Sequence, residues 1–241
     1  MALRHLAIIM DGNRRWARQN ALKLLAGHSH GAQNLKTIAR SVAKYGIQHL
    51  TVFAFSCENW KRSQAEITSL LGLMRKFLKN DIQQLVDDDI RLLIIGDRTA
   101  FDQDLQVAFS HAEQQTEKCT RMTLTLGINY GGRQDILKAA QTAIQKFSEK
   151  SQLQQNEFEM GLNTSLLPDV DLLIRTGGEK RLSNFVLWEI SYAELYFTDV
   201  LWPDFSLQDL SMAIKDYYGR NRRFGGDSVG EVDAVEAIIR G

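Results

Sequence analysis

Short apolar runs alternate with amphipathic stretches along most of the chain. The apolar runs predict five strands and, near residues 194–197, a sixth: residues 6–10, 49–55, 91–95, 122–128 and 170–174. Apolar residues at helical spacing predict helices between and after them: residues 28–45, 64–86, 101–118, 133–148 and 207–218. Such regular alternation predicts an α/β fold, with a mostly parallel central sheet of about six strands flanked by helices.

One domain accounts for this pattern. The chain has 241 residues, and neither a linker-like composition nor an internal repeat divides it. Residues 154–167 are polar and irregular, which predicts an excursion on the surface. We place the end of the domain at residue 226 and assign residues 227–241 to a tail, in which residues 231–240 have the pattern of a short helix.

The predicted helix over residues 64–86 is the most apolar one. Its periodic positions are Ile67, Leu70, Leu71, Leu73, Met74, Phe77, Leu78, Ile82 and Leu85. A helix that faces the core has this pattern, and so does the wall of a hydrophobic tunnel. Periodicity alone does not separate the two.

Composition bears on the partners and the compartment. Lys and Arg together number 29, as do Asp and Glu, so no net charge favours binding to nucleic acid. The first apolar run is too short for a signal peptide, and no stretch approaches the roughly 20 apolar residues that span a bilayer. Cys57 and Cys119 lack metal-ligand spacing and make no disulfide framework. We expect a cytoplasmic protein with free thiols and no nucleic-acid partner.

Candidate chemistry begins where the first strand ends. Asp11 follows the apolar run and precedes Gly12, Asn13, Arg14 and Arg15. In an open α/β sheet, ligands bind beyond the carboxyl ends of the strands, where an acid can hold Mg²⁺. The glycine lets the backbone approach a ligand closely, and the start of the next helix favours an anion. The segment therefore suits a metal-bound diphosphate.

Two further motifs follow later strands and belong at the same edge of the sheet. Asn59 and Arg62 lie on the loop after the second strand, where Asn59 can orient a substrate and Arg62 can stabilise a leaving anion. A polar loop that caps a helix has the same pattern. Arg175 and Arg181 flank a Gly-Gly turn and can converge, with Ser183, on one phosphate-bearing group.

Two single residues have alternative interpretations. Glu194 is an acid among apolar residues and needs a metal or an arginine as its partner. His28 begins a predicted helix, where it is a surface or capping residue or, when protonated, a donor to phosphate.

Together the motifs resemble those of the cis-prenyltransferases, and among them the bacterial undecaprenyl diphosphate synthases. The resemblance runs from His5 to about residue 226 and rests on seven segments: HLAIIMDGNRRWA, GHSHG, TVFAFSCENWKR, LLIIGD, NYGGR, DLLIRTGGEKRLSNFVLWEISYAELYFTD and LWPDF. It implies an Mg²⁺-dependent enzyme that condenses isopentenyl diphosphate onto farnesyl diphosphate with cis double bonds, giving a long product such as undecaprenyl diphosphate. It also implies a homodimer, with peripheral membrane contact when the product is released.

Roles for individual residues follow from the resemblance. Asp11, Asn59 and Arg62 would be catalytic, and Asp11 and Glu194 would bind Mg²⁺. The implied substrate-binding residues are Gly12, Asn13, Arg14, Arg15, Trp16, His28, Ser56, Trp60, Arg175, Arg181, Ser183 and, across a dimer interface, Arg223. Ala54 and Met122 would set the depth of a hydrophobic tunnel, in which a small residue such as Ala54 favours a long product.

The chain departs from the family pattern at two positions. Leu24 stands where many relatives have an arginine that binds the allylic diphosphate. We expect Lys23 to substitute as a point charge, without the bidentate fork of arginine. Ser63 replaces the usual proline after Arg62.

Two other functions compete with this interpretation. A phosphohydrolase that uses Asp11 as its nucleophile would need a second aspartate two residues on, where Asn13 stands. A non-catalytic partner subunit would have lost Asp11 or the pair Arg175 and Arg181, and all three are present.

Overall fold

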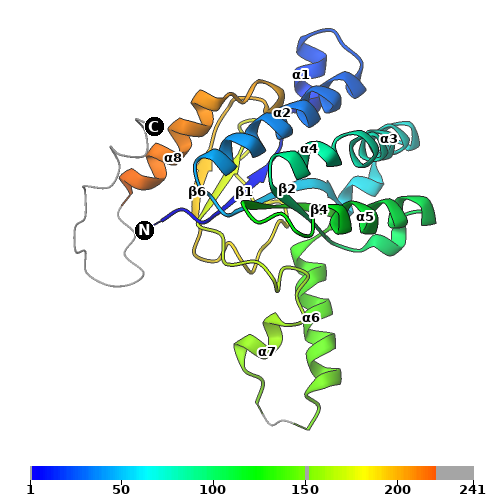
Figure 1. The fold of residues 1–241 in the computed structure, drawn as a ribbon, viewed down its shortest axis with the longest axis vertical. Helices are drawn as coiled ribbons and strands as arrows, with labels where there is room; N and C mark the ends of the chain where they lie inside the picture. Colours follow the sequence, from blue (N-terminus) through cyan, green and yellow to red (C-terminus); the bar gives the residue numbers. More distant parts are fainter. Residues whose placement is uncertain (1, 150–151, 221–241) are drawn as a thin grey trace.

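The computed structural model describes residues 2–149 and 152–220, which contain one parallel sheet of six strands (Figure 1). The strands lie in the order β3-β4-β2-β1-β5-β6. Their bounds are β1 His5–Ile9, β2 His49–Ser56, β3 Ile90–Ile95, β4 Met122–Tyr130, β5 Leu172–Arg175 and β6 Glu194–Phe197. The α/β prediction is confirmed, and each strand agrees with its predicted range to within two residues at either end.

Eight α-helices and three short 3₁₀ turns lie in the described ranges. The helices are α1 Asn13–Gln19, α2 Leu24–Lys44, α3 Gln64–Asn80, α4 Ile82–Asp87, α5 Gln103–Gln115, α6 Gly132–Lys146, α7 Gln155–Glu159 and α8 Leu207–Gly219. The turns are η1 Cys57–Lys61, η2 Arg98–Ala100 and η3 Trp202–Asp204. None of these helices combines the length and the hydrophobicity that a membrane-spanning segment requires.

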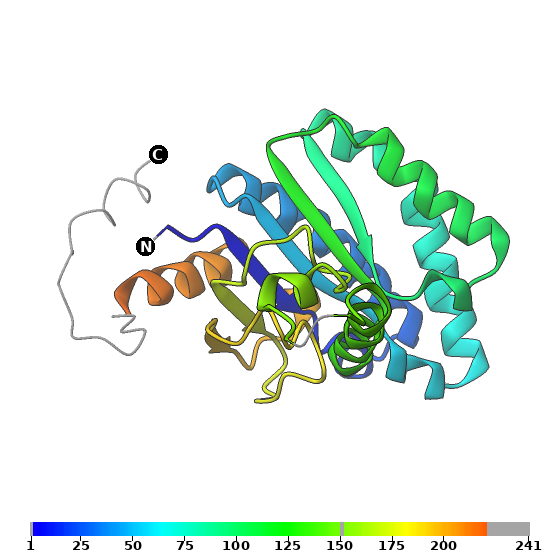
Figure 2. The same cartoon turned by 90° about the horizontal axis from the view of Figure 1, so that it is seen from below.

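Two hydrophobic cores lie on opposite faces of the sheet, because successive residues of a strand point to opposite sides. Leu6 and Ile8 of β1 belong to the first core, which the helices α2, α3, α4, α5 and α8 cover. Ala7 and Ile9 belong to the second core, which is covered by the irregular segment 182–190. In Figure 2 this segment, coloured yellow, lies in front of the strands. Helices therefore cover the first face, and the irregular segment contributes to the cover of the second.

The predicted helix over residues 64–86 is two helices, α3 and α4. They meet at Asp81, whose carboxylate accepts a hydrogen bond of 3.0 Å from Lys36 of α2. The buried side chains of Ile82 and Leu85 continue the apolar stripe across the break. The hydrophobic periodicity therefore did not reveal the break between α3 and α4.

Other helix boundaries also differ from the prediction. Helix α2 begins four residues earlier than expected. The helix expected after Gly12 is α1, for which the sequence predicted no bounds and in which Ala17 is the one buried residue. Ser63, at the position of the family's usual proline, caps α3 through a hydrogen bond of 3.3 Å from the backbone N–H of Glu66. The predicted surface excursion contains the short helix α7, and Leu162 beyond it is buried.

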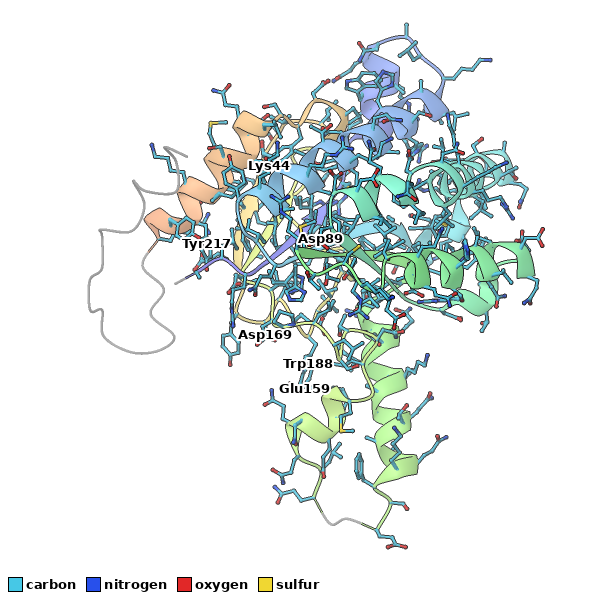
Figure 3. All side chains as sticks on the ribbon, in the orientation of Figure 1. Lys44, Asp89, Glu159, Asp169, Trp188 and Tyr217 are labelled. Atoms are coloured by element: carbon cyan, nitrogen blue, oxygen red, sulfur yellow. The ribbon has the colours of Figure 1, made fainter. Side chains whose placement is uncertain are left out.

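Helices α6 and α7 form an arm that projects from the body of the molecule (Figure 1). The Trp188 side chain attaches this arm: its Nε1 donates to Glu159 Oε1 at 3.0 Å, and its ring lies 4.8 Å from that of Phe158 (Figure 3). The arm is therefore held to the segment that covers the second core.

A buried polar cluster lies where the arm joins the body. Asp135 of α6 accepts hydrogen bonds from the backbone N and Nδ2 of Asn163 at 2.9 and 2.6 Å, and Thr164 Oγ1 donates to Glu189. Asp135 and Glu189 are only 3% and 5% exposed. Burial raises the pKa of Glu189, and repulsion from Asp135 and Asp169 acts in the same direction, against the opposing hydrogen bond from Thr164. The cluster thus favours the neutral acid at Glu189.

We predict that Glu189→Gln flattens the pH dependence of stability and stabilises the protein at neutral pH. In the wild type, the folded state binds the Glu189 proton more tightly than the unfolded state does. The stability that this proton contributes is fully present below the pKa of Glu189 in the unfolded chain, and it is lost as pH rises through the higher pKa of the folded state. Glutamine keeps an acceptor for Thr164 without a charge, so the free energy of unfolding should rise by about 1 kcal/mol at pH 7. This corresponds to a melting temperature about 2–4 °C higher.

Thermal unfolding of both proteins between pH 4 and pH 8 measures the effect. The control is Glu117→Gln, at an exposed position just beyond α5, which should leave the profile unchanged. Parallel pH profiles for wild type and Glu189→Gln would contradict the prediction.

Candidate active site

The three predicted motifs meet at the carboxyl edge of the sheet. In the parallel register Ile9 of β1 pairs with Arg175 of β5, so Asp11 and Arg175 leave the sheet side by side. They line a cavity of about 510 Å³ together with Asn59, Arg62 and Ser183. Residues from three distant parts of the sequence therefore share one cleft.

Arg175 is the fixed centre of this cleft. Its side chain is 4% exposed, its Nη2 donates to Asp11 Oδ2 at 2.9 Å, and its Nη1 donates to Ser183 Oγ at 2.7 Å and to the carbonyl of Arg181. Three acceptors on two segments, Asp11 on one and the Arg181 carbonyl with Ser183 on the other, fix the plane of the guanidinium group. One face of the group is thereby presented to the cavity in a single orientation.

The side chains of Arg175 and Arg181 do not converge in this structure. The Arg181 side chain is 61% exposed and forms an ion pair with Glu179, and only its backbone carbonyl contacts Arg175. The sequence indicated the pair of arginines but not the difference in their burial. Arg175 is buried and held by three hydrogen bonds, and Arg181 is exposed.

Asp11 is held by its backbone and flanked by two arginines. Its carbonyl accepts hydrogen bonds from Thr176 Oγ1 at 2.7 Å and from the backbone N–H of Trp202 at 3.0 Å. Its second carboxylate oxygen lies 3.4 Å from Arg15 Nη2. Gly177, at φ +82°, lets that guanidinium approach, since a Cβ there would lie 2.5 Å from Arg15 Nη2. The carboxylate remains 29% exposed and therefore accessible to a ligand.

A second cluster surrounds Glu66 at the start of α3. Its Oε1 lies 2.9 Å from Arg62 Nη1 and 3.8 Å from both Arg14 Nε and His28 Nε2, and its side chain is 8% exposed. Sequence analysis gave Glu66 no role. Its position four residues after Arg62, on the first turn of a helix, is a local sequence signal for such an ion pair, which the sequence analysis did not use.

His28 is held in its neutral form. Burial is the main cause that lowers its pKa to about 4, and repulsion from Arg62 and Arg14 outweighs the attraction of Glu66. At neutral pH it therefore offers a single ring N–H to a ligand, not the charged donor considered from the sequence. His28 lines a cavity of about 290 Å³ whose other walls include Asp11, Gly12, Asn13, Arg14, Arg15, Arg18 and Arg62.

Several of the predicted site residues also have partners within the structure. Trp60 Nε1 donates to Asn129 Oδ1 at 2.8 Å, and Trp16 Nε1 donates to Asp204 Oδ1 at 2.7 Å. Asn59 Oδ1 accepts from the backbone N–H of Ser56 at 3.0 Å and so caps η1. Asn59 and Ser56 also line the cleft with Arg175, so this loop both caps η1 and forms part of the cleft wall.

Glu194 lies far from Asp11 within the chain. As the first residue of β6 it is level with Leu172, which pairs with Leu6, five residues before Asp11. At about 3.3 Å per residue the two carboxylates are more than roughly 15 Å apart. Glu194 accepts a hydrogen bond of 2.7 Å from Arg220. The two acids therefore do not form one metal site within the chain.

Among the described residues, Lys23 is not part of the lining of the cleft. Lys23 is exposed at the N-cap of α2, next to Leu24. Arg223, the predicted tail and the predicted domain end at residue 226 lie outside the described residues.

An apolar pocket of about 130 Å³ opens from the polar cleft. Met10 and His28 line the pocket and also line the polar cavities. Its other walls come from α2, β2, β4 and α3, and include Ala32, Leu35, Ala54, Phe55, Leu70, Leu73, Met74, Phe77, Leu126 and Ile128. Of the apolar stripe on residues 64–86, Leu70, Leu73, Met74 and Phe77 face the pocket while Ile67, Leu78, Ile82 and Leu85 are buried. The stripe is thus partly core and partly pocket wall.

A cationic cleft that continues into an apolar pocket suits a ligand with an anionic head and a hydrocarbon tail. The fold and site therefore define a parallel α/β protein with a cleft suited to amphiphilic anions.

Comparison with known proteins gives the family. A family model described as a putative undecaprenyl diphosphate synthase matches residues 9–225. An isoprenyl transferase of Treponema denticola is 45% identical over 225 residues, which cover 92% of this chain and 97% of that protein. A (2E,6E)-farnesyl-diphosphate-specific ditrans,polycis-undecaprenyl-diphosphate synthase of Haemophilus influenzae is 44% identical over 92% of this chain and 95% of its own length.

Solved structures agree with this result. The crystal structure of lavandulyl diphosphate synthase from Lavandula x intermedia, in complex with dimethylallyl diphosphate, matches with a TM-score of 0.89 and 38% identity, covering 92% of this chain and 98% of that chain. A probable undecaprenyl diphosphate synthase from Campylobacter jejuni matches with a TM-score of 0.79 and 33% identity, covering 93% and 99%. The chain belongs to the undecaprenyl diphosphate synthase family and is a cis-prenyltransferase that elongates prenyl chains.

Proposed function

We propose that this enzyme condenses isopentenyl diphosphate with farnesyl diphosphate, in the presence of Mg²⁺, and forms a cis double bond in each cycle. The observation that carries the proposal is the continuity of the polar cleft with the apolar pocket through Met10 and His28. An allylic diphosphate has a charged head for the cleft and a hydrocarbon tail for the pocket. The farnesyl-specific name of the Haemophilus influenzae relative supports this choice of primer.

The two diphosphates would occupy different parts of the cleft. The cavity around Arg14, Arg15 and His28 adjoins the apolar pocket and would hold the allylic diphosphate. Arg175 and Ser183 line the other part and would hold isopentenyl diphosphate, with the exposed Arg181 turning inward to join them. This arrangement would set the allylic carbon between the two charged groups.

Mg²⁺ fits the oxygen donors present if the substrate supplies most of its ligands. No group of three or more His, Cys, Asp or Glu side chains in the described ranges is placed to hold a metal by itself. Asp11 presents one partly exposed carboxylate to the cleft, and Mg²⁺ is commonly bound by one or two carboxylates together with phosphate oxygens and water. When bound there, Mg²⁺ would neutralise negative charge that develops on the departing diphosphate.

The chain's own residues would assist each change of charge. When the bond between the allylic carbon and its diphosphate breaks, Arg62 and Arg14 would stabilise the leaving oxygens. Arg175 would hold isopentenyl diphosphate while its double bond attacks the allylic carbon and a proton is lost. The Asn59 amide lies on the same cleft and would orient the reacting groups.

Growth of the product would follow the apolar pocket. Each buried CH₂ contributes about 0.8 kcal/mol, so a lengthening chain is favoured along the pocket wall formed by Leu70, Leu73, Met74 and Phe77. Ala54 occupies one wall as a small side chain, which leaves room for a long product. We therefore propose a long-chain product of the undecaprenyl diphosphate type.

One assay tests the function. Incubation with farnesyl diphosphate, labelled isopentenyl diphosphate and Mg²⁺, followed by chromatography of the products, should give a ladder that ends in a long polyprenyl diphosphate. Absence of elongation by the wild type, or release of inorganic phosphate from simple phosphoesters, would favour the alternative functions.

We predict that Leu24→Arg lowers the KM for farnesyl diphosphate by about five- to tenfold, because an arginine at the start of α2 adds a charge-assisted contact to the diphosphate. Lys23→Ala should raise the same KM about two- to threefold, since an exposed point charge contributes little. Steady-state kinetics with the primer varied provides both values. If neither variant changes that KM, the hypothesis that Lys23 substitutes for an arginine at position 24 is wrong.

We propose that the enzyme acts as a homodimer that pairs through its projecting arm. Leu137 and Ile144, two turns apart on α6, are 61% and 70% exposed, and Met160 and Leu166 near α7 are 63% and 75% exposed. An apolar face of this kind on one projecting element is typical of an interface.

The double variant Leu137→Glu, Ile144→Glu should therefore run as a monomer, whereas the wild type should have twice the mass of one chain. Light scattering after gel filtration measures both. The matched control, Val107→Glu, changes an apolar side chain of α5 that is 58% exposed and should leave the dimer intact. A monomeric wild type would exclude the proposal.

A further inference from the structure

Asn184 connects three segments around the cleft. Its Nδ2 donates to Glu58 Oε1 at 3.1 Å and to Gln134 Oε1 at 3.0 Å, and its Oδ1 accepts from the backbone N–H of Arg133 at 2.8 Å. Its carbonyl accepts from the backbone N–H of Gly132 at 2.7 Å. A residue from the loop after β5 thus caps the start of α6 and at the same time reaches the turn η1.

The residues beside these contacts belong to the two halves of the cleft. Ser183, which precedes Asn184, accepts the hydrogen bond from Arg175. Glu58 precedes Asn59, on the turn that leads to Arg62. The Asn184–Glu58 hydrogen bond therefore joins the Arg175–Ser183 side of the cleft to the Asn59–Arg62 side, and α6 provides a rigid support for the junction.

The backbone at this point favours asparagine. Ser183 and Asn184 have φ values of +50° and +63°, in the left-handed region that asparagine tolerates better than most residues. The acceptor is charged: burial acts to raise the pKa of Glu58, but hydrogen bonds from Asn184 and from its own backbone outweigh it, and the pKa is lowered. A hydrogen bond to a carboxylate is about twice as strong as a neutral one.

We propose that Asn184, through its hydrogen bond to Glu58, is a positioning residue that fixes the isopentenyl diphosphate side of the cleft relative to the loop carrying Asn59 and Arg62. The inference rests on the proposed function of the cleft. It assigns the placement of the two sides of the cleft relative to each other to the Asn184–Glu58 hydrogen bond, whose two residues also line the cleft.

The variant Asn184→Asp separates positioning from folding. Aspartate keeps the size, the acceptor for Arg133 and the tolerance of positive φ, but it places an oxygen opposite Glu58 and Gln134. The KM for isopentenyl diphosphate should rise about tenfold, which corresponds to the loss of one charge-assisted hydrogen bond. The KM for farnesyl diphosphate should change less than about twofold, since its cavity shares no hydrogen bond with Asn184.

The double variant Asn184→Asp, Glu58→Gln exchanges donor and acceptor. The glutamine amide introduced at position 58 can donate to the aspartate introduced at position 184, so the KM for isopentenyl diphosphate should return to within about threefold of the wild type. Glu58→Gln alone retains an acceptor for Asn184 and should have a mild effect. Asn156→Asp, on α7, is the control for adding a negative charge elsewhere.

Kinetics and inorganic diphosphate binding together decide the outcome. If the wild type elongates but Asn184→Asp leaves the KM unchanged, or if the double variant is no better than the single one, the positioning role is wrong. If the wild type does not elongate, the proposed function fails. Calorimetry with inorganic diphosphate then tests the junction alone: weaker binding by Asn184→Asp that the double variant restores supports it, and equal binding by all three proteins overturns it.

Discussion

Replacing Asp11 by asparagine should lower the turnover number by about a thousandfold or more while the protein stays folded. Loss of a carboxylate that holds Mg²⁺ against a departing diphosphate removes several kcal/mol of transition-state stabilisation. The asparagine side chain retains an oxygen to accept from Arg175, and the backbone contacts of Asp11 to Thr176 and Trp202 are unaffected. The chemistry is therefore damaged far more than the architecture.

Single-turnover measurements with farnesyl and isopentenyl diphosphates, at several Mg²⁺ concentrations, give the size of this effect. The matched control is Asp97→Asn. Asp97 also follows a strand at the same edge of the sheet, but its carboxylate accepts hydrogen bonds from Thr99 and caps η2. The control should retain turnover to within about twofold, because surface substitutions away from a site have small effects. Comparable losses of turnover in the two variants would contradict the proposed role of Asp11 in holding Mg²⁺.

Arg175→Lys is the second large effect expected. Lysine keeps the charge but lacks the planar fork, so it cannot contact Asp11, Ser183 and the Arg181 carbonyl at once. At a site that is 4% exposed, the unpaired acceptors should cost about 2–4 kcal/mol of stability. The specificity constant for isopentenyl diphosphate should fall about a hundredfold.

Urea unfolding and steady-state kinetics separate these two losses. Arg181→Lys is the natural comparison, since that side chain is 61% exposed and makes its ion pair with Glu179 on the surface. It should lose less than about tenfold in the same constant and almost nothing in stability. Equal kinetic losses at both positions would mean that the exposed arginine binds the substrate as firmly as the buried one.

The sequence contained enough information to predict the sheet and the edge where the site lies. Asp11, Asn59 and Arg175 each follow or end a strand, and parallel strands bring their carboxyl ends to one edge. The same rule, applied strictly, separates Glu194 from them, because this acid stands at the beginning of β6 and not beyond its end. Within one chain this acid instead accepts a hydrogen bond from Arg220.

Other features depend on contacts that no local pattern contains. The break at Asp81 interrupts a helix without interrupting its apolar stripe. Arg175 is buried and Arg181 is exposed because the Arg175 side chain contacts Asp11, which lies 164 residues away in the sequence. The grouping of Arg14, His28 and Arg62 around Glu66 likewise requires three segments to meet. The family pattern gave the composition of the site, and tertiary packing gave its electrostatics.

The position of Glu66 has a consequence for how a substrate enters. Its carboxylate neutralises part of the charge of Arg14 and Arg62 before any ligand arrives. An incoming diphosphate would therefore replace Glu66 as the ion-pair partner of these arginines. It would not enter a cavity whose positive charge is uncompensated. Substrate affinity should then depend less steeply on ionic strength than the number of arginines suggests, because fewer mobile counterions are displaced. Cellular phosphate, which has no hydrocarbon tail to offset that exchange, would compete poorly.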